Sequence, residues 1–142
     1  MDLETVSADA FGRSLTALGV NLLTRDVRAL AAFLSEIFEI TIHRLSDDFA
    51  IAQHGSAFMQ LHADGTFHSH PLLALLPENP PRGPGAQFYL FGIDPDDAAA
   101  RATAAGHLVI EAPSDKPHGL RECTILAPDG YAFSPAITLP TG

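Results

Sequence analysis

Three histidines gather in one short stretch of the sequence. His62, His68 and His70 lie close together with Asp64 between them, and imidazole and carboxylate groups are common ligands of divalent metals. Their spacing matches neither a helix face nor a zinc hairpin, and residues 65–71 have the composition of a loop. We therefore interpret them as surface or cavity-rim histidines. A displaced metal site assembled from them stays open as the alternative.

A charged pair, Arg121 and Glu122, interrupts an apolar strand-like segment. Neighbouring residues of a strand face opposite sides, so only one of the two can face a cavity. An inward-facing Arg121 would attract a carboxylate or phosphate group of a ligand. An Arg121 on the other side would form a structural ion pair, and the sequence leaves both readings open.

Nucleophilic catalysis has no support in the sequence. No Gly-x-Ser-x-Gly element is present, and the single cysteine, Cys123, lacks a recognisable nucleophile motif. Its apolar setting predicts a buried structural thiol. The paired carboxylates at 47–48 and 96–97 suit a turn and a helix start, where capping and solvation explain them.

Composition excludes several classes of partner. The 142 residues suit one domain, and 46% hydrophobic against 18% charged residues is typical of a globular fold. With 8 basic and 17 acidic residues the net charge is −9, without a basic cluster. Nucleic acid and anionic membranes are therefore not expected as partners. No apolar run has the length of a signal or membrane segment, so we expect a cytoplasmic protein.

The elements that must position these residues occur as two copies of one pattern. In the first copy a strand-like run, 18–23, precedes Asp26, which can cap a helix with an apolar stripe from Leu30 to Phe38. In the second, the run 87–93 precedes Asp94, which suits a helix cap. The helix that follows is expected to end at Gly106 and to begin with Pro95 in its first turn.

Asp26 and Asp94 stand 68 positions apart, which indicates an internal duplication. Three short strands are expected after each helix, at 40–45, 49–53 and 57–62, and at 107–112, 120–126 and 131–137. We predict an α+β fold of one domain, 1–142, with module one at about 18–64, a linker at 65–85 and module two at about 86–139. A small helix can form over 7–15; the role of residues 1–17 is not readable.

This arrangement resembles the vicinal oxygen chelate superfamily, which includes glyoxalases, bleomycin-resistance proteins and extradiol dioxygenases. The resemblance spans about residues 18–139 and rests on RGPGAQFY at 82–89, GLRE at 119–122 and APDGY at 127–131. It implies two βαβββ modules whose eight strands form a pair of curved half-barrel sheets with the helices outside. It also implies a homodimer and, in enzymatic members, a divalent metal that chelates two adjacent substrate oxygens.

The resemblance also assigns four metal-ligand positions, which fall on Gly19, Gln60, Gln87 and Ser134. None of these residues carries an imidazole, thiolate or carboxylate group, on which zinc, iron and manganese sites depend. We therefore expect no metal and no other cofactor. The same positions are expected to face the cavity and to hydrogen-bond a ligand.

Alternation along the strands adds aromatic and polar residues to this wall. The expected ligand-binding residues are Gln60, His62, Gln87, Tyr89, Phe91, Arg121 and Ser134. Phe58 shares the parity of Gln60, and His118 falls where relatives often place an aromatic residue at the cavity mouth. The leading hypothesis is metal-independent binding of a small apolar or aromatic molecule. The alternative is a metal-dependent lyase, isomerase or dioxygenase acting on vicinal oxygens through shifted ligands such as His62 or His43.

Overall fold

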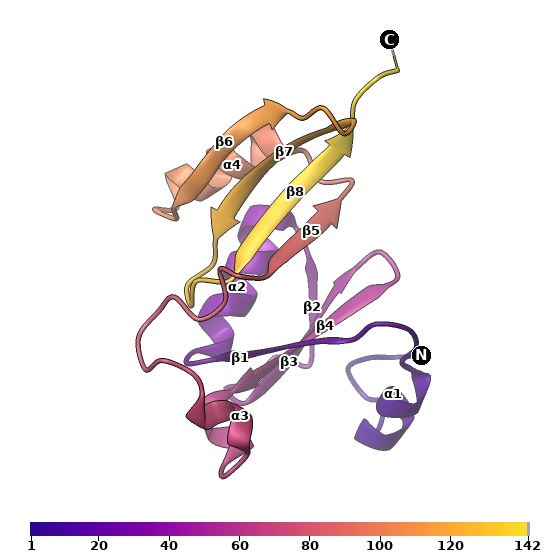
Figure 1. The fold of residues 1–142 in the computed structure, drawn as a ribbon. Helices are drawn as coiled ribbons and strands as arrows, with labels where there is room; N and C mark the ends of the chain where they lie inside the picture. The colour runs from indigo at the N-terminus through magenta and orange to yellow at the C-terminus, as the bar shows by residue number, and fades with distance from the viewer. Residues whose placement is uncertain (142) are drawn as a thin grey trace. The chain divides into compact units, whose positions relative to one another are not determined.

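The computed structural model describes residues 1–141. Its contacts divide the chain into two compact units, one formed by 1–35 and 40–74, the other by 36–39 and the described residues from 75 onward. Figure 1 shows that each unit holds one sheet, which we call sheet 1 and sheet 2 in chain order. The predicted α+β class, with two βαβββ modules, is confirmed.

Sheet 1 follows from the first copy of the pattern. Its strands are ordered β1-β4-β3-β2, with β1 parallel to β4 and the other pairs antiparallel. Asp26 caps the helix as predicted, because its Oδ1 accepts from the amide of Ala29 at 3.0 Å. The elements are β1 (Val20–Thr24), α2 (Val27–Phe38), β2 (Thr41–His43), β3 (Phe49–His54) and β4 (Ala57–Ala63).

Sheet 2 repeats this topology with the order β5-β8-β7-β6, and β5 is parallel to β8. Asp94 caps α4 through the amides of Asp96 and Asp97, at 2.8 and 3.3 Å, and the helix gives way to Gly106 at φ 83°. The elements are β5 (Gln87–Phe91), α4 (Pro95–Ala104), β6 (Val109–Asp115), β7 (Leu120–Leu126) and β8 (Ala132–Thr138).

Strand β6 differs most from the prediction, at both of its ends. The strand expected at 107–112 begins at Val109, because the amide of His107 still bonds the Ala102 carbonyl at the end of α4. It also continues through Pro113 to Asp115. Strand β6 lies at the edge of sheet 2 and pairs with β7 through register shifts, and an edge strand tolerates proline.

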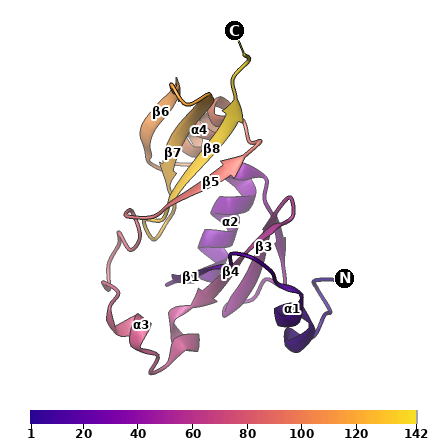
Figure 2. The ribbon, with the colours of Figure 1, turned by 45° about the vertical axis from the view of Figure 1, so that its right-hand side comes forward.

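The segments outside the two modules contain three short helices. The helix expected at 7–15 is present as α1 (Ala8–Ser14), which begins where Ser7 accepts from the amide of Ala10 at 3.1 Å. The predicted linker contains the end of the 3-10 helix η1 (Asp64–Phe67) and α3 (Pro71–Ala74). Both views place α1 beside sheet 1 (Figure 2). None of the helices in residues 1–141 is long and apolar enough to span a membrane.

Candidate functional site

Sheet 2 has one face against α4 and a second face that carries four of the predicted site residues, namely Gln87, Tyr89, Phe91 and Ser134. Cys123 Sγ lies 3.5 Å from the Pro95 carbonyl, which places the odd-numbered residues of β7 toward the helix. Gln87, Tyr89 and Phe91 project from the other side, which we call the Gln87 face. The rings of Tyr89 and Phe91 stack at 5.3 Å with an interplanar angle of 8°. They remain 36% and 60% exposed.

A short hydrogen-bond chain crosses the Gln87 face. Gln87 donates from Nε2 to Oγ of Ser134 at 2.8 Å, and this hydroxyl lies 3.0 Å from that of Thr124. Ser134 and Thr124 are buried, whereas Gln87 is exposed. Gln87 and Ser134, two of the four positions to which the family resemblance assigns metal ligands, are therefore hydrogen-bonded to each other.

The same face holds a buried carboxylate that the sequence did not single out for this role. Glu122 is only 3% exposed. It accepts a hydrogen bond from the hydroxyl of Tyr89 at 2.9 Å, and its other oxygen lies 2.7 Å from Nε2 of His118. Bonding to Glu122 raises the pKa of Tyr89 above its ordinary value. Glu122 and Thr124 are two positions apart on β7 and so share a face, which is the sequence signal that could have placed Glu122 at this site.

Arg121 lies apart from these residues. Its guanidinium group holds both oxygens of Asp96, at 2.7 and 2.8 Å, and Asp115 at 2.9 Å. These hydrogen bonds raise its pKa further. Because Asp96 belongs to α4, Arg121 points to the helix side of sheet 2. The structural ion pair, which the sequence left open, is the arrangement found.

Sheet 1 brings Gln60 and His62 together, with Phe58, on one face of β4. Their partners on β3 are Ile51, Phe49 and Gln53, so this surface, which we call the Gln60 face, combines apolar and polar side chains. The side chain of His62 lies against Phe49, with a ring distance of 4.9 Å. Its Nδ1 is 2.5 Å from Oδ1 of Asn21, and burial lowers the pKa of the imidazole.

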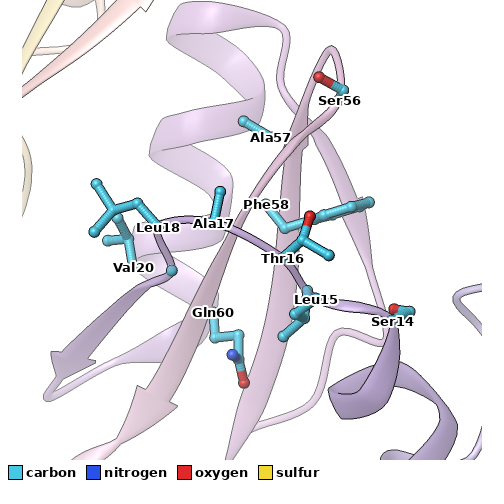
Figure 3. Close-up of a pocket in the computed structure, with 11 residues that line it drawn as sticks. Ser14, Leu15, Thr16, Ala17, Leu18, Val20, Ser56, Ala57, Phe58 and Gln60 are labelled. Carbon is cyan, nitrogen blue, oxygen red and sulfur yellow. The ribbon is translucent and has the colours of Figure 1, made fainter.

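Two pockets open on the Gln60 face, and both include Gln60. The larger, about 390 Å³, is lined by Phe11 and Leu15 near α1 and by Phe49, Ile51 and His62 on the sheet. The smaller, about 240 Å³, lies where the chain enters β1 and is lined by residues 14–20, 56–58 and 60 (Figure 3).

The remaining histidines do not assemble a metal site. The Phe67 ring lies 5.7 Å from that of His62 and 5.0 Å from that of His70. His43 bonds Gln53 at 2.9 Å. Within residues 1–141 no three His, Cys, Asp or Glu side chains converge in a way that could hold a metal ion. No observation therefore favours the displaced site over the interpretation as ordinary polar side chains.

The four positions to which the resemblance assigns metal ligands also fit a divalent metal poorly. Gly19 has no side chain, Gln60 and Gln87 offer only neutral amides, and the hydroxyl of Ser134 already serves Gln87 and Thr124. Stable zinc, iron and manganese sites use imidazole, thiolate or carboxylate ligands. This donor set supports no catalytic step through a metal.

Solved structures share this fold. The first, a glyoxalase/bleomycin resistance protein/dioxygenase family enzyme from Burkholderia phytofirmans PsJN, has a TM-score of 0.69 and 21% identity, covering 84% of this chain and 96% of that chain. A glyoxalase-related enzyme from Fulvimarina pelagi has a TM-score of 0.69 and 18% identity, with coverages of 90% and 94%. A lactoylglutathione lyase from Agrobacterium tumefaciens has a TM-score of 0.61 and 17% identity, and the match covers 86% of this chain and 92% of that chain. Identities this low show the fold alone.

Family membership follows from the sequence. No curated protein matches the chain significantly. The model of the Glyoxalase/Bleomycin resistance protein/Dioxygenase superfamily matches residues 16–134, which covers both modules and the segment between them. It also agrees with the resemblance carried by the motifs at 82–89 and 127–131. The chain therefore belongs to the Glyoxalase/Bleomycin resistance protein/Dioxygenase superfamily.

Proposed function

We propose that this protein binds a small apolar or aromatic molecule on the Gln87 face of sheet 2 without a metal ion. The observation that carries the proposal is the stacked pair of Tyr89 and Phe91, whose rings are 36% and 60% exposed. Exposed aromatic rings on a strand offer a flat apolar surface that gains free energy when a second ring covers it.

Polar groups beside the rings would orient the ligand. Gln87 uses its Nε2 to bond Ser134, so its amide oxygen can accept a hydrogen bond from a ligand. The Tyr89 hydroxyl donates to Glu122, which fixes the direction of this polar group beside the rings. A few fixed polar groups beside an apolar surface are typical of small-molecule sites.

Ligand chemistry supports the metal independence that we propose. The positions that hold a metal in enzymatic relatives are neutral here, and Gln87 and Ser134 are bonded to each other. A neutral set binds divalent ions weakly. Aromatic binding should therefore be unchanged by a chelator, whereas the metal-dependent alternative requires that a chelator abolish activity.

The test is a titration of the full chain with indole, followed by two-dimensional NMR of the backbone amides in buffer with and without EDTA. We expect shifts along β5 that are the same in both buffers. Phe91→Ala should weaken binding about tenfold, the loss expected for one stacking contact. Leu75→Ala is the matched control, because Leu75 is also exposed but lies outside the strands. Absent shifts on β5, equal losses in the two variants, or dependence on metal would each overturn the proposal.

We also propose that the protein forms a homodimer and is located in the cytoplasm. The homodimer rests on the family resemblance. The cytoplasmic location rests on the lack of an apolar run of the length of a signal or membrane segment, and the free thiol of Cys123 is compatible with it. Light scattering of the purified chain should give twice the monomer mass. A monomer at all concentrations would contradict the homodimer and leave the binding site untouched.

A further inference from the structure

Sheet 1 differs from sheet 2 because residues 1–15, which we call the N-terminal arm, pack on its Gln60 face. Phe11, Leu3 and Ile51 form a buried cluster, against which Phe49 and Phe58 also pack. The rings of Phe11 and Phe58 meet edge to face at 6.0 Å and 84°. The family match begins at residue 16, so the arm is an addition to the matched region.

The arm does not fill the surface that it covers. The pocket of about 390 Å³ lies between them, with Ala8, Phe11, Gly12 and Leu15 on the arm side. Phe49 and Ile51 supply apolar walls from β3. The volume falls in the range that small-molecule sites occupy.

Two polar side chains from β4 reach this pocket with hydrogen-bonding capacity to spare. His62 shares its Nδ1 hydrogen with the amide oxygen of Asn21, which leaves Nε2 as an acceptor. The Gln60 amide has no hydrogen-bond partner in the part of the chain that the structure describes. Gln60 and His62 are two positions apart on β4, so a single ligand group can meet both.

The pocket has no net charge of its own that would select an ion. Burial lowers the pKa of His62, so its imidazole is neutral at physiological pH. The charged lining residues are Arg44 and Asp48, which have opposite signs, and the Arg44 guanidinium donates to the carbonyl of Val6 in the arm. An ionised ligand would lose hydration here without a dedicated counter-charge.

We propose that the pocket beneath the N-terminal arm is a second binding site, for a small uncharged aromatic molecule that carries a hydroxyl group. The hydroxyl donates to Nε2 of His62 and accepts from the amide of Gln60. The ring of the ligand lies among Phe11, Phe49 and Ile51. Every residue that lines this site belongs to residues 8–66, so the proposal rests on the first unit alone.

The first experiment compares phenol, toluene and benzoate by NMR titration of the full chain, with amide shifts at Phe11 and Phe49 as the readout. We expect phenol to bind about tenfold more tightly than toluene, because toluene leaves His62 and Gln60 unpaired. Benzoate should bind more weakly than phenol. Absence of phenol binding, or benzoate binding that equals it, would overturn the proposal.

Two substitutions locate the effect. Gln60→Met keeps the size of the side chain and removes the amide, so the preference for phenol over toluene should fall while toluene still binds. Asn79→Met is the matched control, because it removes an amide from an exposed position outside the strands, and it should leave the shifts at Phe11 and Phe49 unchanged. An undiminished preference in Gln60→Met would contradict the assigned role of the amide.

Filling the pocket gives a test that removes no packing contact. Gly12 lines the pocket, and an added Cβ there would meet no atom within 4 Å. Gly12→Leu should therefore fold, improve the helix propensity of α1 and abolish the phenol-induced shifts at Phe11 and Phe49. Indole-induced shifts along β5 should persist in this variant, which separates the two sites. Unaltered phenol binding in Gly12→Leu would refute the site.

Discussion

Gln87 and Ser134 are joined by a hydrogen bond of 2.8 Å from the amide nitrogen to the hydroxyl. The family resemblance assigns metal ligands to both positions, and here the two side chains bond each other. Their strands β5 and β8 are parallel neighbours, so the bond ties the first strand of module two to the last. The pair thus contributes to the stability of sheet 2 instead of supplying open coordination sites.

Removing the hydroxyl of Ser134 should measure that contribution. Ser134→Ala deprives Gln87 and the buried hydroxyl of Thr124 of a partner, and the expected loss is about 1 kcal/mol in the free energy of unfolding. Urea denaturation checks it. Ser56→Ala, in an exposed turn, is the control and should change stability little. Equal midpoints for the two variants would contradict the structural role of Ser134.

Tyr89 should titrate above its ordinary pKa of 10.0, since Glu122 accepts its proton in a hydrogen bond and repels the phenolate. The chain has two tyrosines, so Tyr131→Phe leaves Tyr89 as the only one, and its ultraviolet absorbance reports its ionisation. Glu122→Gln in that background should lower the midpoint toward 10.0. A midpoint that does not move in Glu122→Gln would show that this carboxylate is not the cause of the raised pKa.

The raised pKa of Tyr89 also predicts how the free energy of unfolding changes at alkaline pH. The unfolded chain releases the Tyr89 proton at a lower pH than the native chain does, so the native state holds more protons between the two pKa values. Stability that depends on this group is therefore complete below pH 10.0 and falls as the pH rises above it. Tyr89→Phe should show a smaller decline over that range in thermal unfolding.

Cys123 should resist thiol reagents in the native protein. It is fully buried, and burial raises its pKa to about 11, so the reactive thiolate is scarce at neutral pH. We expect one equivalent to react with a disulfide reagent after unfolding in guanidinium and very slow reaction before it. Rapid labelling in buffer alone would show that α4 does not shield the thiol from solvent.

Arg121→Gln should affect stability modestly and ligand binding hardly at all. The variant loses the contacts with Asp96 and Asp115, both of which are exposed enough to regain water. The expected cost is small, and it should diminish at high salt. Indole binding on the Gln87 face serves as the second measurement. A large loss of indole affinity would instead support a ligand-binding role for Arg121.

Local signals explain why so much of the fold could be predicted. Asp26 and Asp94 both cap helices because a cap depends on a few neighbouring residues, and both lie in the same place of their modules. Strand alternation also placed Gln87, Tyr89 and Phe91 on one face. These features need no knowledge of distant contacts, so the 68-residue repeat and its elements were within reach of the sequence.

The remaining features depend on contacts between distant residues. Alternation separates Arg121 from Glu122 but does not say which of the two faces the helix, and the partner that decides it, Asp96, is 25 positions away. The N-terminal arm is an amphipathic fragment whose place is fixed by Phe58, 47 residues beyond Phe11. Neither relationship has a periodic signature that a single sequence could reveal.

The N-terminal arm makes the surfaces of the two duplicated modules different. The two modules repeat the same order of elements, but the arm packs on the sheet of the first. The rings of Tyr89 and Phe91 on β5 are exposed, whereas the pocket beside β4 has Phe11 of the arm in its lining. Substitutions in one module can then change the ligand that it would bind without changing the other module, which is a division of labour within a single chain.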